Sequence, residues 1–351
     1  MFTTVEDGLT KSDYPEHSEF REQDWHILAG FWHPVAFAHE IKEKPVPSKL
    51  LDVDLVIYRT ADAITVAKDV CPHRSTQLSQ GHIVDDCLVC PMHGMRFDSS
   101  GVCRKIPSVP NQSLPISPRM NLQLYQSTEH YGIIWTCLKA SPIWPLPMWP
   151  GINDPELQKV FVPADTWHCS AARHTENFND QAHFPFVHLK SFGSSEDLST
   201  HDYEVKKTDF GLRFDYAYTE GGNRFPDGVK KENREVIYTY DLTFPFSTLL
   251  YVDAQESDFI HYFADAVCPV SVNETRMFQQ LTDSTGNPDP EYWVRDSLQI
   301  LAEDQPLVEG QSRPISLGQG EEYHHIPADR WSILYRKLLR DQFGLGIAHR
   351  E

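Results

Sequence analysis

Two short motifs, each with one cysteine and one histidine, stand close together in the first third of this 351-residue chain. The first reads C-x-H and the second reads C-x-x-H, with residues 74–89 between them. A segment of this length can form a hairpin that brings two loops face to face. A proline stiffens each loop after the cysteine, and Gly94 permits a turn beside the second histidine. The chain must therefore fold so that four side chains converge on one metal centre: Cys71, His73, Cys90 and His93.

These four ligands match a [2Fe–2S] cluster of mixed ligation, in which two thiolates bind one iron and two neutral imidazoles bind the other. Replacing two thiolates by imidazoles removes negative charge, and this raises the reduction potential. Each imidazole also keeps a second nitrogen that can form a hydrogen bond outward. Zinc is the alternative metal, but zinc sites usually group C-x-x-C with a histidine pair three to five residues apart. The spacing favours the iron–sulfur cluster.

The other five cysteines are interpreted as structural. Seven cysteines is an odd number, and a chain of this length does not need a disulfide scaffold. Each of the five is expected to be a small buried hydrophobic side chain and not a ligand: Cys87, Cys103, Cys137, Cys169 and Cys268.

The charge balance and the N-terminus narrow the class of protein. The chain carries 31 Lys and Arg against 50 Asp and Glu, a formal net charge of −19. This excludes a broad nucleic-acid surface, which needs clustered cations, and argues against binding to anionic membranes. The N-terminus has neither the basic nor the apolar segment of a secretory signal, and no run of about 18 apolar residues is present. We expect a cytoplasmic protein with a solvated acidic surface.

The pattern along the chain predicts two domains. Residues 1–24 are acidic and polar and are expected to form an N-terminal arm. Residues 25–140 contain short β-branched runs separated by Gly, Asp and Pro, which is typical of a small all-β domain. Residues 141–152 are rich in proline and are expected to be a linker. Residues 153–351 mix strand-like and helical patterns and form the second expected domain.

Within the second domain, strands are expected at 212–220 and 235–244. Helices are expected at 290–304, with Asp289 as the N-cap, and at 328–343, where one apolar stripe recurs with helical spacing.

A second constellation of metal-binding type lies at 176–188. His183 and His188 would point about 140° apart on an unbroken helix. Pro185 disfavours helix at Phe184, so a bend there can turn His188 back toward the same metal. Asp180 precedes His183 by three residues and would share its face before the bend. Two histidines and one carboxylate on one face of Fe(II) leave open positions for O₂ and substrate.

The carboxylate must come from another part of the chain. Asp304 is our candidate because it ends the expected 290–304 helix and Pro306 follows. The competing carboxylates are Glu303, Asp296 and Glu309, and the residues alone do not choose among the four. Three other histidines lack a comparable setting and are interpreted as structural or exposed: His174, His324 and His325.

Together the two constellations resemble those of the Rieske non-heme iron oxygenases, over most of residues 25–350. The family pattern C-x-H…C-x-x-H falls on the four cluster residues, and N-x-x-D-x-x-H-x₄-H falls on Asn177, Asp180, His183 and His188. The third iron ligand of the family is an Asp on a late helix, often within E-D-x-x-x-x-E, which supports Asp304. The compact length is similar to that of vanillate O-demethylases, dicamba monooxygenases and methylxanthine N-demethylases.

The resemblance implies an α+β chain, with an N-terminal all-β Rieske domain and a catalytic domain whose antiparallel sheet is flanked by helices. It implies a [2Fe–2S] cluster and a mononuclear Fe(II) that activates O₂ to demethylate or hydroxylate a small aromatic or heterocyclic substrate. An NAD(P)H-dependent reductase, of flavin or ferredoxin type, would supply the electrons. In a homotrimer, Asp180 would bridge His183 and His93 of the partner subunit, and Asn177 would lie near the iron without being a strong ligand.

The chain departs from the family pattern at Met92 and Met95, where many members carry aromatic residues. Neither departure removes a ligand. Two other functions are compatible with parts of the sequence: an electron-transfer Rieske protein, and a non-catalytic subunit of a larger oxygenase complex. The first leaves about 200 further residues with a second metal motif unexplained, and the second would be expected to have degenerate motifs.

Overall fold

The computed structural model describes residues 13–109, 115–221, 233–254, 260–284, 286, 289, 291–311 and 324–346. The chain divides into two compact units, Met1–Trp144 and Pro145–Glu351. The division falls inside the proline-rich segment 141–152.

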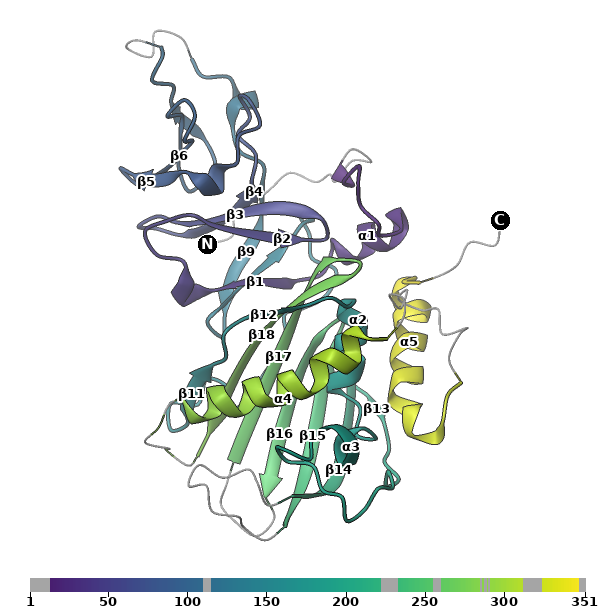
Figure 1. The fold of residues 1–351 in the computed structure, drawn as a ribbon. Coiled ribbons are helices and arrows are strands. Elements are labelled where there is room, and N and C mark those ends of the chain that lie inside the picture. The colour runs from purple at the N-terminus through teal and green to yellow at the C-terminus, as the bar shows by residue number, and fades with distance from the viewer. Residues whose placement is uncertain are drawn as a thin grey trace, which may run out of the picture. The chain divides into compact units, whose positions relative to one another are not determined.

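The N-terminal unit contains two antiparallel sheets (Figure 1). The larger sheet has the strand order β1-β10-β9-β4-β3-β2, and the smaller one has the order β5-β6-β7-β8. The strands are β1 (His33–Phe37), β2 (Val46–Leu50), β3 (Val53–Arg59), β4 (Ile64–Lys68), β5 (His82–Val84), β6 (Cys87–Val89), β7 (Arg96–Phe97), β8 (Cys103–Lys105), β9 (Leu124–His130) and β10 (Ile133–Cys137). Short 3₁₀ turns lie at Ala38–Glu40, Leu78–Gln80 and Pro118–Met120.

Three hairpins of this unit close through two-residue turns. Both residues of each turn have positive φ, which is the geometry of a type I′ turn and matches the right-handed twist of the paired strands. Leu51 and Asp52 join β2 to β3, Asp85 and Asp86 join β5 to β6, and Tyr131 and Gly132 join β9 to β10. The second hairpin belongs to the small sheet, and the loop that carries the second cysteine–histidine motif lies between β6 and β7 of this sheet.

The N-terminal unit begins with a helix and not with a strand. Helix α1 (Glu22–Leu28) buries Trp25 and Leu28, and the indole of Trp25 donates to the carbonyl of Leu51 at 2.7 Å. Tyr14 packs edge-on against Trp25 with ring centroids 5.7 Å apart. The expected end of the polar arm at residue 24 therefore falls inside α1, and residues 1–12 lie outside the described part of the chain.

The C-terminal unit is built on one long antiparallel sheet (Figure 1). Its strand order is β11-β18-β17-β16-β15-β14-β13, and β12 also pairs with β18. The strands are β11 (Gln158–Phe161), β12 (Asp165–Trp167), β13 (Lys206–Lys207), β14 (Gly211–Glu220), β15 (Arg234–Thr243), β16 (Ser247–Ala254), β17 (Ile260–Ser271) and β18 (Glu274–Asp283). The strands expected at 212–220 and 235–244 are thus confirmed as β14 and β15.

Alternation of side chains explains why these segments form strands with one buried face. In β14, Leu212, Phe214, Tyr216 and Tyr218 are buried, while the residues between them face outward. Phe214 stacks on Tyr240 of β15 with ring centroids 4.7 Å apart. Such cross-strand aromatic pairs stabilise a sheet and set its register.

Helices cover one face of the sheet (Figure 1). This face carries the aromatic residues, because Phe178 and Phe184 of two of the helices contact Tyr240 and Tyr218. The helices are α2 (Ala171–Phe178), α3 (Phe184–Val187), α4 (Tyr292–Glu309) and α5 (Arg330–Phe343), and a 3₁₀ turn at Pro327–Asp329 precedes α5. The terminal helix is confirmed within two residues of its expected start. The expected α+β class, with an all-β unit followed by an antiparallel sheet flanked by helices, is also confirmed. No helix in the described ranges is long and apolar enough to cross a bilayer.

Helix α4 differs from its expected form at both ends. It starts at Tyr292 with Glu291 as its N-cap, so Asp289 lies before the cap, and it continues through Pro306 to Glu309. Proline removes the hydrogen bond that the Ala302 carbonyl would otherwise accept. The helix tolerates this loss because one stripe is anchored in the interior on both sides of Pro306: Trp293, Ser297, Leu301, Asp304 and Val308.

Candidate metal centres

The two cysteine–histidine motifs occupy loops of the same backbone design. In each loop the N–H of the cysteine donates to the carbonyl five residues later, and the cysteine carbonyl accepts from the N–H four residues later. The residue at that fourth position has a left-handed backbone: Ser75 has φ 54° and Gly94 has φ 68°. A Cβ at Gly94 would lie 3.2 Å from Cγ of Pro107. Glycine adopts this conformation without strain and avoids a tight contact with Pro107, as the sequence predicted for the turn, whereas Ser75 adopts the same conformation with a side chain.

The four side chains lie as one thiol pair and one imidazole pair. The Nδ1 atoms of His73 and His93 are 3.2 Å apart, a separation at which two nitrogens can bind one iron. The thiol of Cys90 is in hydrogen-bond contact with Cys71. Burial is the main cause that raises the pKa of Cys71, so iron has to displace a proton from this thiol. In this arrangement the two thiols can bind one iron and the two imidazoles can bind the other.

The cysteines are buried and the histidines are exposed. Since the Nδ1 atoms face each other, the Nε2 atoms are left for hydrogen bonds beyond the loops. Met95 is buried in the hydrophobic core beneath the loops, and Met92 is 61% exposed next to His93. The two methionines that depart from the family pattern therefore have different environments.

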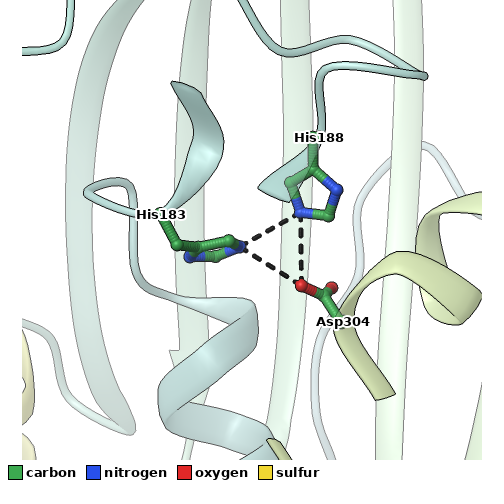
Figure 2. A group of neighbouring side chains, drawn as sticks. All are labelled: His183, His188 and Asp304. Atoms are coloured by element: carbon green, nitrogen blue, oxygen red, sulfur yellow. Dashed lines mark hydrogen bonds and ion pairs between the residues drawn. The ribbon is translucent and has the colours of Figure 1, made fainter. Parts of the chain in front are cut away.

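A second group of ligand atoms lies in the C-terminal unit (Figure 2). His183, His188 and Asp304 each offer one atom, and these atoms lie within 4.8 Å of one another. The two Nε2 atoms are 3.1 Å apart, and Oδ1 of Asp304 is 3.5 Å from Nε2 of His183 and 3.4 Å from Nε2 of His188. Ligands about 2.1 Å from a metal and at right angles to each other are about 3 Å apart. The three atoms therefore fit one face of an octahedral ion, and two nitrogens with one carboxylate oxygen suit Fe(II).

The two histidines are brought together by a different local structure from the one predicted. The sequence suggested one helix bent at Pro185, with helix disfavoured at Phe184. Instead α2 ends at Phe178, and Phe184 and Pro185 begin the separate four-residue helix α3. Proline is well placed there because the first turn of a helix needs no N–H donor. His183 is the N-cap and His188 is the C-cap of α3, so both rings flank a single helical turn.

Asp304 is the only one of the four candidate carboxylates that lies in the buried stripe of α4 and in this group. Glu309 accepts a hydrogen bond from the backbone N–H of His168 at 2.8 Å. Glu303 contacts His188 at its outer nitrogen and not at the ligand atom. Asp296 is not part of the group among the described residues. The spacing of Asp304 from Leu301 and Val308 is the sequence signal that could have separated it from its neighbours.

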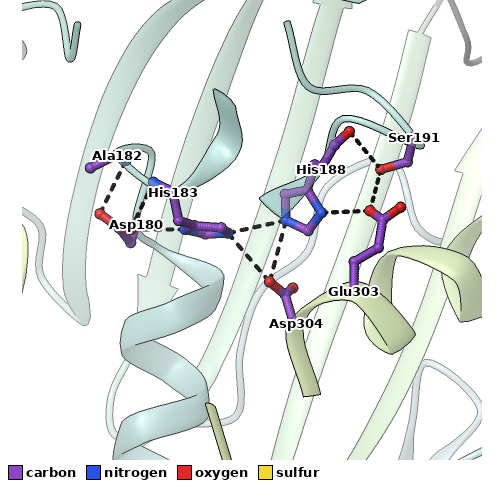
Figure 3. Close-up of polar contacts among 7 residues, drawn as sticks. All are labelled: Asp180, Ala182, His183, His188, Ser191, Glu303 and Asp304. Carbon is purple, nitrogen blue, oxygen red and sulfur yellow. Dashed lines mark hydrogen bonds and ion pairs between the residues drawn. The ribbon is translucent and has the colours of Figure 1, made fainter. Parts of the chain in front are cut away.

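Each histidine of the triad is held by a carboxylate on its other nitrogen (Figure 3). Oδ2 of Asp180 lies 2.8 Å from Nδ1 of His183, and Oε2 of Glu303 lies 2.9 Å from Nδ1 of His188. Asp180 also accepts from the backbone N–H groups of Ala182 and His183, each at 3.2 Å, and so fixes the turn before α3. It therefore reaches His183 from a turn and not from a shared helix face.

Two pKa shifts follow from these contacts. Burial alone would raise the pKa of Asp180, but the hydrogen bond and the charge of His183 lower it below its usual value. Burial lowers the pKa of His188, although Asp304 opposes this shift. The first shift favours an ionised Asp180, and the second favours a neutral His188, which is the form of imidazole that binds a metal.

The triad opens onto a cavity with mainly aromatic walls. Its lining consists of Asn177, Phe178, His183, Phe184, His188, Phe192, Tyr238, Tyr240, Leu250, Phe263, Ile300 and Asp304. Among these lining residues, Asn177 is the one that carries a side-chain amide. Four of the walls, Tyr238, Tyr240, Leu250 and Phe263, are successive inward residues of β15, β16 and β17. Sequence reasoning did not name these four residues.

His174 is not part of either centre. It is buried, and its Nε2 lies 3.1 Å from Oδ2 of Asp265. Oδ1 of Asp265 accepts from the side-chain amide of Gln279 at 2.8 Å. His324 and His325 are exposed.

Comparison with known families gives two matches along the chain. Residues 31–125 match the Rieske [2Fe-2S] domain, and residues 167–342 match the vanillate O-demethylase oxygenase C-terminal domain. The first match contains both cysteine–histidine loops, and the second contains the triad.

Individual relatives cover nearly the whole chain. The methylxanthine N1-demethylase NdmA of Pseudomonas putida is 30% identical over 92% of this chain and 91% of its own length. The methylxanthine N3-demethylase NdmB of the same organism is 30% identical over 90% and 89%. The solved structure of NdmA with caffeine superposes with a TM-score of 0.80 at 27% identity, covering 92% of this chain and 93% of that one.

Proposed function

Since the chain belongs to the Rieske non-heme iron oxygenases with a catalytic domain of the vanillate O-demethylase type, we propose that it oxidatively demethylates a small planar heterocyclic or aromatic compound. The cofactors of this family are a [2Fe–2S] cluster and a mononuclear iron. The observation that carries the proposal is the opening of the His183, His188 and Asp304 group onto a cavity with aromatic walls.

In this proposal Cys71, His73, Cys90 and His93 bind the cluster, and His183, His188 and Asp304 bind the mononuclear iron. When bound, that iron supplies the activation of O₂ with electrons received from the cluster. The protein supplies ligands on one face only, which leaves the cavity side of the metal open.

The cavity selects the substrate by shape and polarity. Phe178, Phe192 and Phe263 offer flat apolar walls, which favour a planar ring. Asn177 offers an amide that can orient a carbonyl or a ring nitrogen of the substrate near the iron. An N-methyl heterocycle is the first substrate class to test, because the relatives that match over the full length are named as methylxanthine N-demethylases. Oxidation at such a methyl group gives an N-hydroxymethyl product, which releases formaldehyde.

Electrons reach the iron, in this proposal, through Asp180. Its carboxylate keeps 31% of its surface exposed while it holds His183, so it can accept a further hydrogen bond. The exposed imidazole of His93 of the partner subunit would donate that bond in a homotrimer. A separate NAD(P)H-dependent reductase of flavin or ferredoxin type would reduce the cluster.

A screen for released formaldehyde tests this function. The purified protein, with its cluster and iron loaded, is combined with NADH, a surrogate reductase and panels of N-methyl heterocycles and methoxy aromatics. We expect NADH-dependent formaldehyde from at least one N-methyl compound and none from the His183→Ala variant. Equal release by the variant, or a hydroxylated ring with the methyl group intact, would contradict demethylation at this iron.

A further inference from the structure

Glu303 uses both oxygens of its carboxylate beside the triad (Figure 3). Oε2 lies 2.9 Å from Nδ1 of His188 and accepts from the hydroxyl of Ser191 at 2.7 Å. Oε1 accepts from the amide of Gln299 at 3.0 Å. The side chain is only 6% exposed. A carboxylate with this many donors is fixed in position and direction.

We propose that Glu303 is the positioning residue for the iron ligand His188 and raises the affinity of this site for Fe(II). This inference rests on the proposed function only in assuming that iron binds at the triad. Because Glu303 accepts the proton on Nδ1, the imidazole is held in the tautomer that presents Nε2 to the metal. Its negative charge also makes the imidazole a better donor to a cation.

The chain holds His188 from three sides. Glu303 fixes the ring at Nδ1, and Phe192 stacks on the ring with centroids 4.6 Å apart. Ser191 donates to Glu303 and also lies 3.3 Å from the carbonyl of His188, so it links the backbone of the ligand to the carboxylate. Glu303 and Asp304 are neighbours on α4. One turn of this helix therefore supplies both a metal ligand and the group that orients another ligand.

The two histidines are held by carboxylates with different surroundings. Asp180, which holds His183, is 31% exposed and is anchored by backbone N–H groups of its own turn. Glu303 is 6% exposed and comes from a helix distant in sequence. Asp180 is partly exposed and can contact another molecule, whereas Glu303 is buried and acts inside the site.

Burial of Glu303 also predicts how iron and stability are coupled. Among the ion pairs of the described residues, the partner of Glu303 is His188, and no Lys or Arg is paired with it. A buried carboxylate beside a neutral imidazole is costly. A metal cation on the far side of that imidazole offsets the cost. The carboxylate of Glu303 should therefore contribute more to the stability of the iron-bound protein than to the stability of the iron-free protein.

The test measures Fe(II) binding to protein that carries the cluster but has an empty mononuclear site, by anaerobic equilibrium dialysis. Glu303→Gln keeps the shape and an acceptor oxygen but removes the charge, and we expect the dissociation constant to rise about 10-fold. Glu303→Ala removes both, and we expect about 100-fold. The matched control is Glu309→Gln on the same helix. Its carboxylate accepts from the His168 N–H and from the amide of Gln305, and the substitution should leave the constant unchanged.

Three readouts decide the outcome. Visible absorption of the cluster should be the same in all variants, which shows that the N-terminal unit is intact. The thermal midpoint of the iron-free protein should be unchanged or higher in Glu303→Gln. The inference would be overturned if Glu303→Gln bound Fe(II) with the wild-type dissociation constant. If its thermal midpoint were also lower, the role of Glu303 would be structural. A wild-type site that binds no Fe(II) would refute the proposed function instead.

Discussion

The Nε2 atoms of His183 and His188 lie 3.1 Å apart, although the two residues cap opposite ends of one helical turn. Five residues of continuous helix would turn the second ring about 140° away from the first. The chain places only the four-residue helix α3 between the two residues, and the backbone departs from helical geometry at His188, which has φ −96° and ψ 25°. The short helix α3 therefore separates the two proposed iron ligands, and a proline lies in its first turn.

Replacement of the third ligand should remove one metal and leave the other centre intact. In Asp304→Asn a neutral amide oxygen replaces the carboxylate, and this is a poorer ligand for Fe(II). We expect iron to fall from about three to about two atoms per chain with acid-labile sulfide unchanged. Asp296→Asn, on the same helix but outside the triad, is the matched control and should keep all three. Loss of sulfide, or full iron in the Asp304→Asn variant, would refute the assignment.

The substitution Asp180→Asn should separate metal binding from electron transfer. The amide oxygen that it introduces can still accept from the backbone N–H groups, so both metals should be retained. In the proposed function this charge couples His183 to the electron donor, so we expect its loss to lower turnover by about 10- to 100-fold. Reoxidation of the chemically reduced cluster, followed by absorbance with substrate and O₂ present, should slow by the same factor. Asp209→Asn, at an exposed position, should have no effect. Normal turnover with normal metal content would exclude a bridging role.

The paired cluster loops allow a stability test with two opposite substitutions. Ser75 and Gly94 occupy the same position of their loops, and both have positive φ. Gly94→Ala should destabilise the cluster-bound protein by about 1 kcal/mol or more, since it adds left-handed strain and a contact with Pro107. Ser75→Gly removes comparable strain but gains entropy in the unfolded chain, so the net change should stay within about 0.5 kcal/mol. Urea unfolding measures both, and the reverse order would contradict the shared loop geometry.

His33 should make the N-terminal unit sensitive to acid. Burial lowers the pKa of His33 to about 4, although Nε2 contacts the Leu28 carbonyl at 2.9 Å. The unfolded chain, with a histidine pKa near 6.5, then binds more protons than the folded one below pH 6.5. This contribution to stability is present above pH 6.5 and is lost as the pH falls toward 4. Because of this group, the free energy of unfolding should fall by about 2 kcal/mol between pH 7 and pH 5.

The variant His33→Gln isolates this effect, because its amide can still donate to the Leu28 carbonyl but does not titrate. Urea unfolding at pH 7 and pH 5 should show a smaller pH-dependent loss of stability in the variant than in the parent. The same loss in both proteins would show that other groups control the acid sensitivity.

Much of the fold was predictable because its signals are local. Alternating apolar residues mark β14 and β15, and the apolar stripe of residues 328–343 marks α5. Local rules failed where packing outweighed propensity. Helix α4 runs through Pro306, since buried Leu301 and Val308 hold it on both sides of the proline. At α3, proline starts a helix and does not bend one.

For the metal centres, the sequence by itself determined the ligand types, the two Cys–His pairs and the His183–His188 spacing, because these depend on residue chemistry and on short separations along the chain. Only the tertiary structure decided between Glu303 and Asp304. Adjacent residues of a helix point about 100° apart, so the rotation of α4 about its axis decides which of the two carboxylates faces the metal site and which one holds His188. That rotation is fixed by which side chains of α4 are buried. The spacing of Asp304 from Leu301 and Val308 indicates the buried side of the helix, but only the packed structure brings its oxygen to the nitrogens of two histidines more than 100 residues away in the sequence.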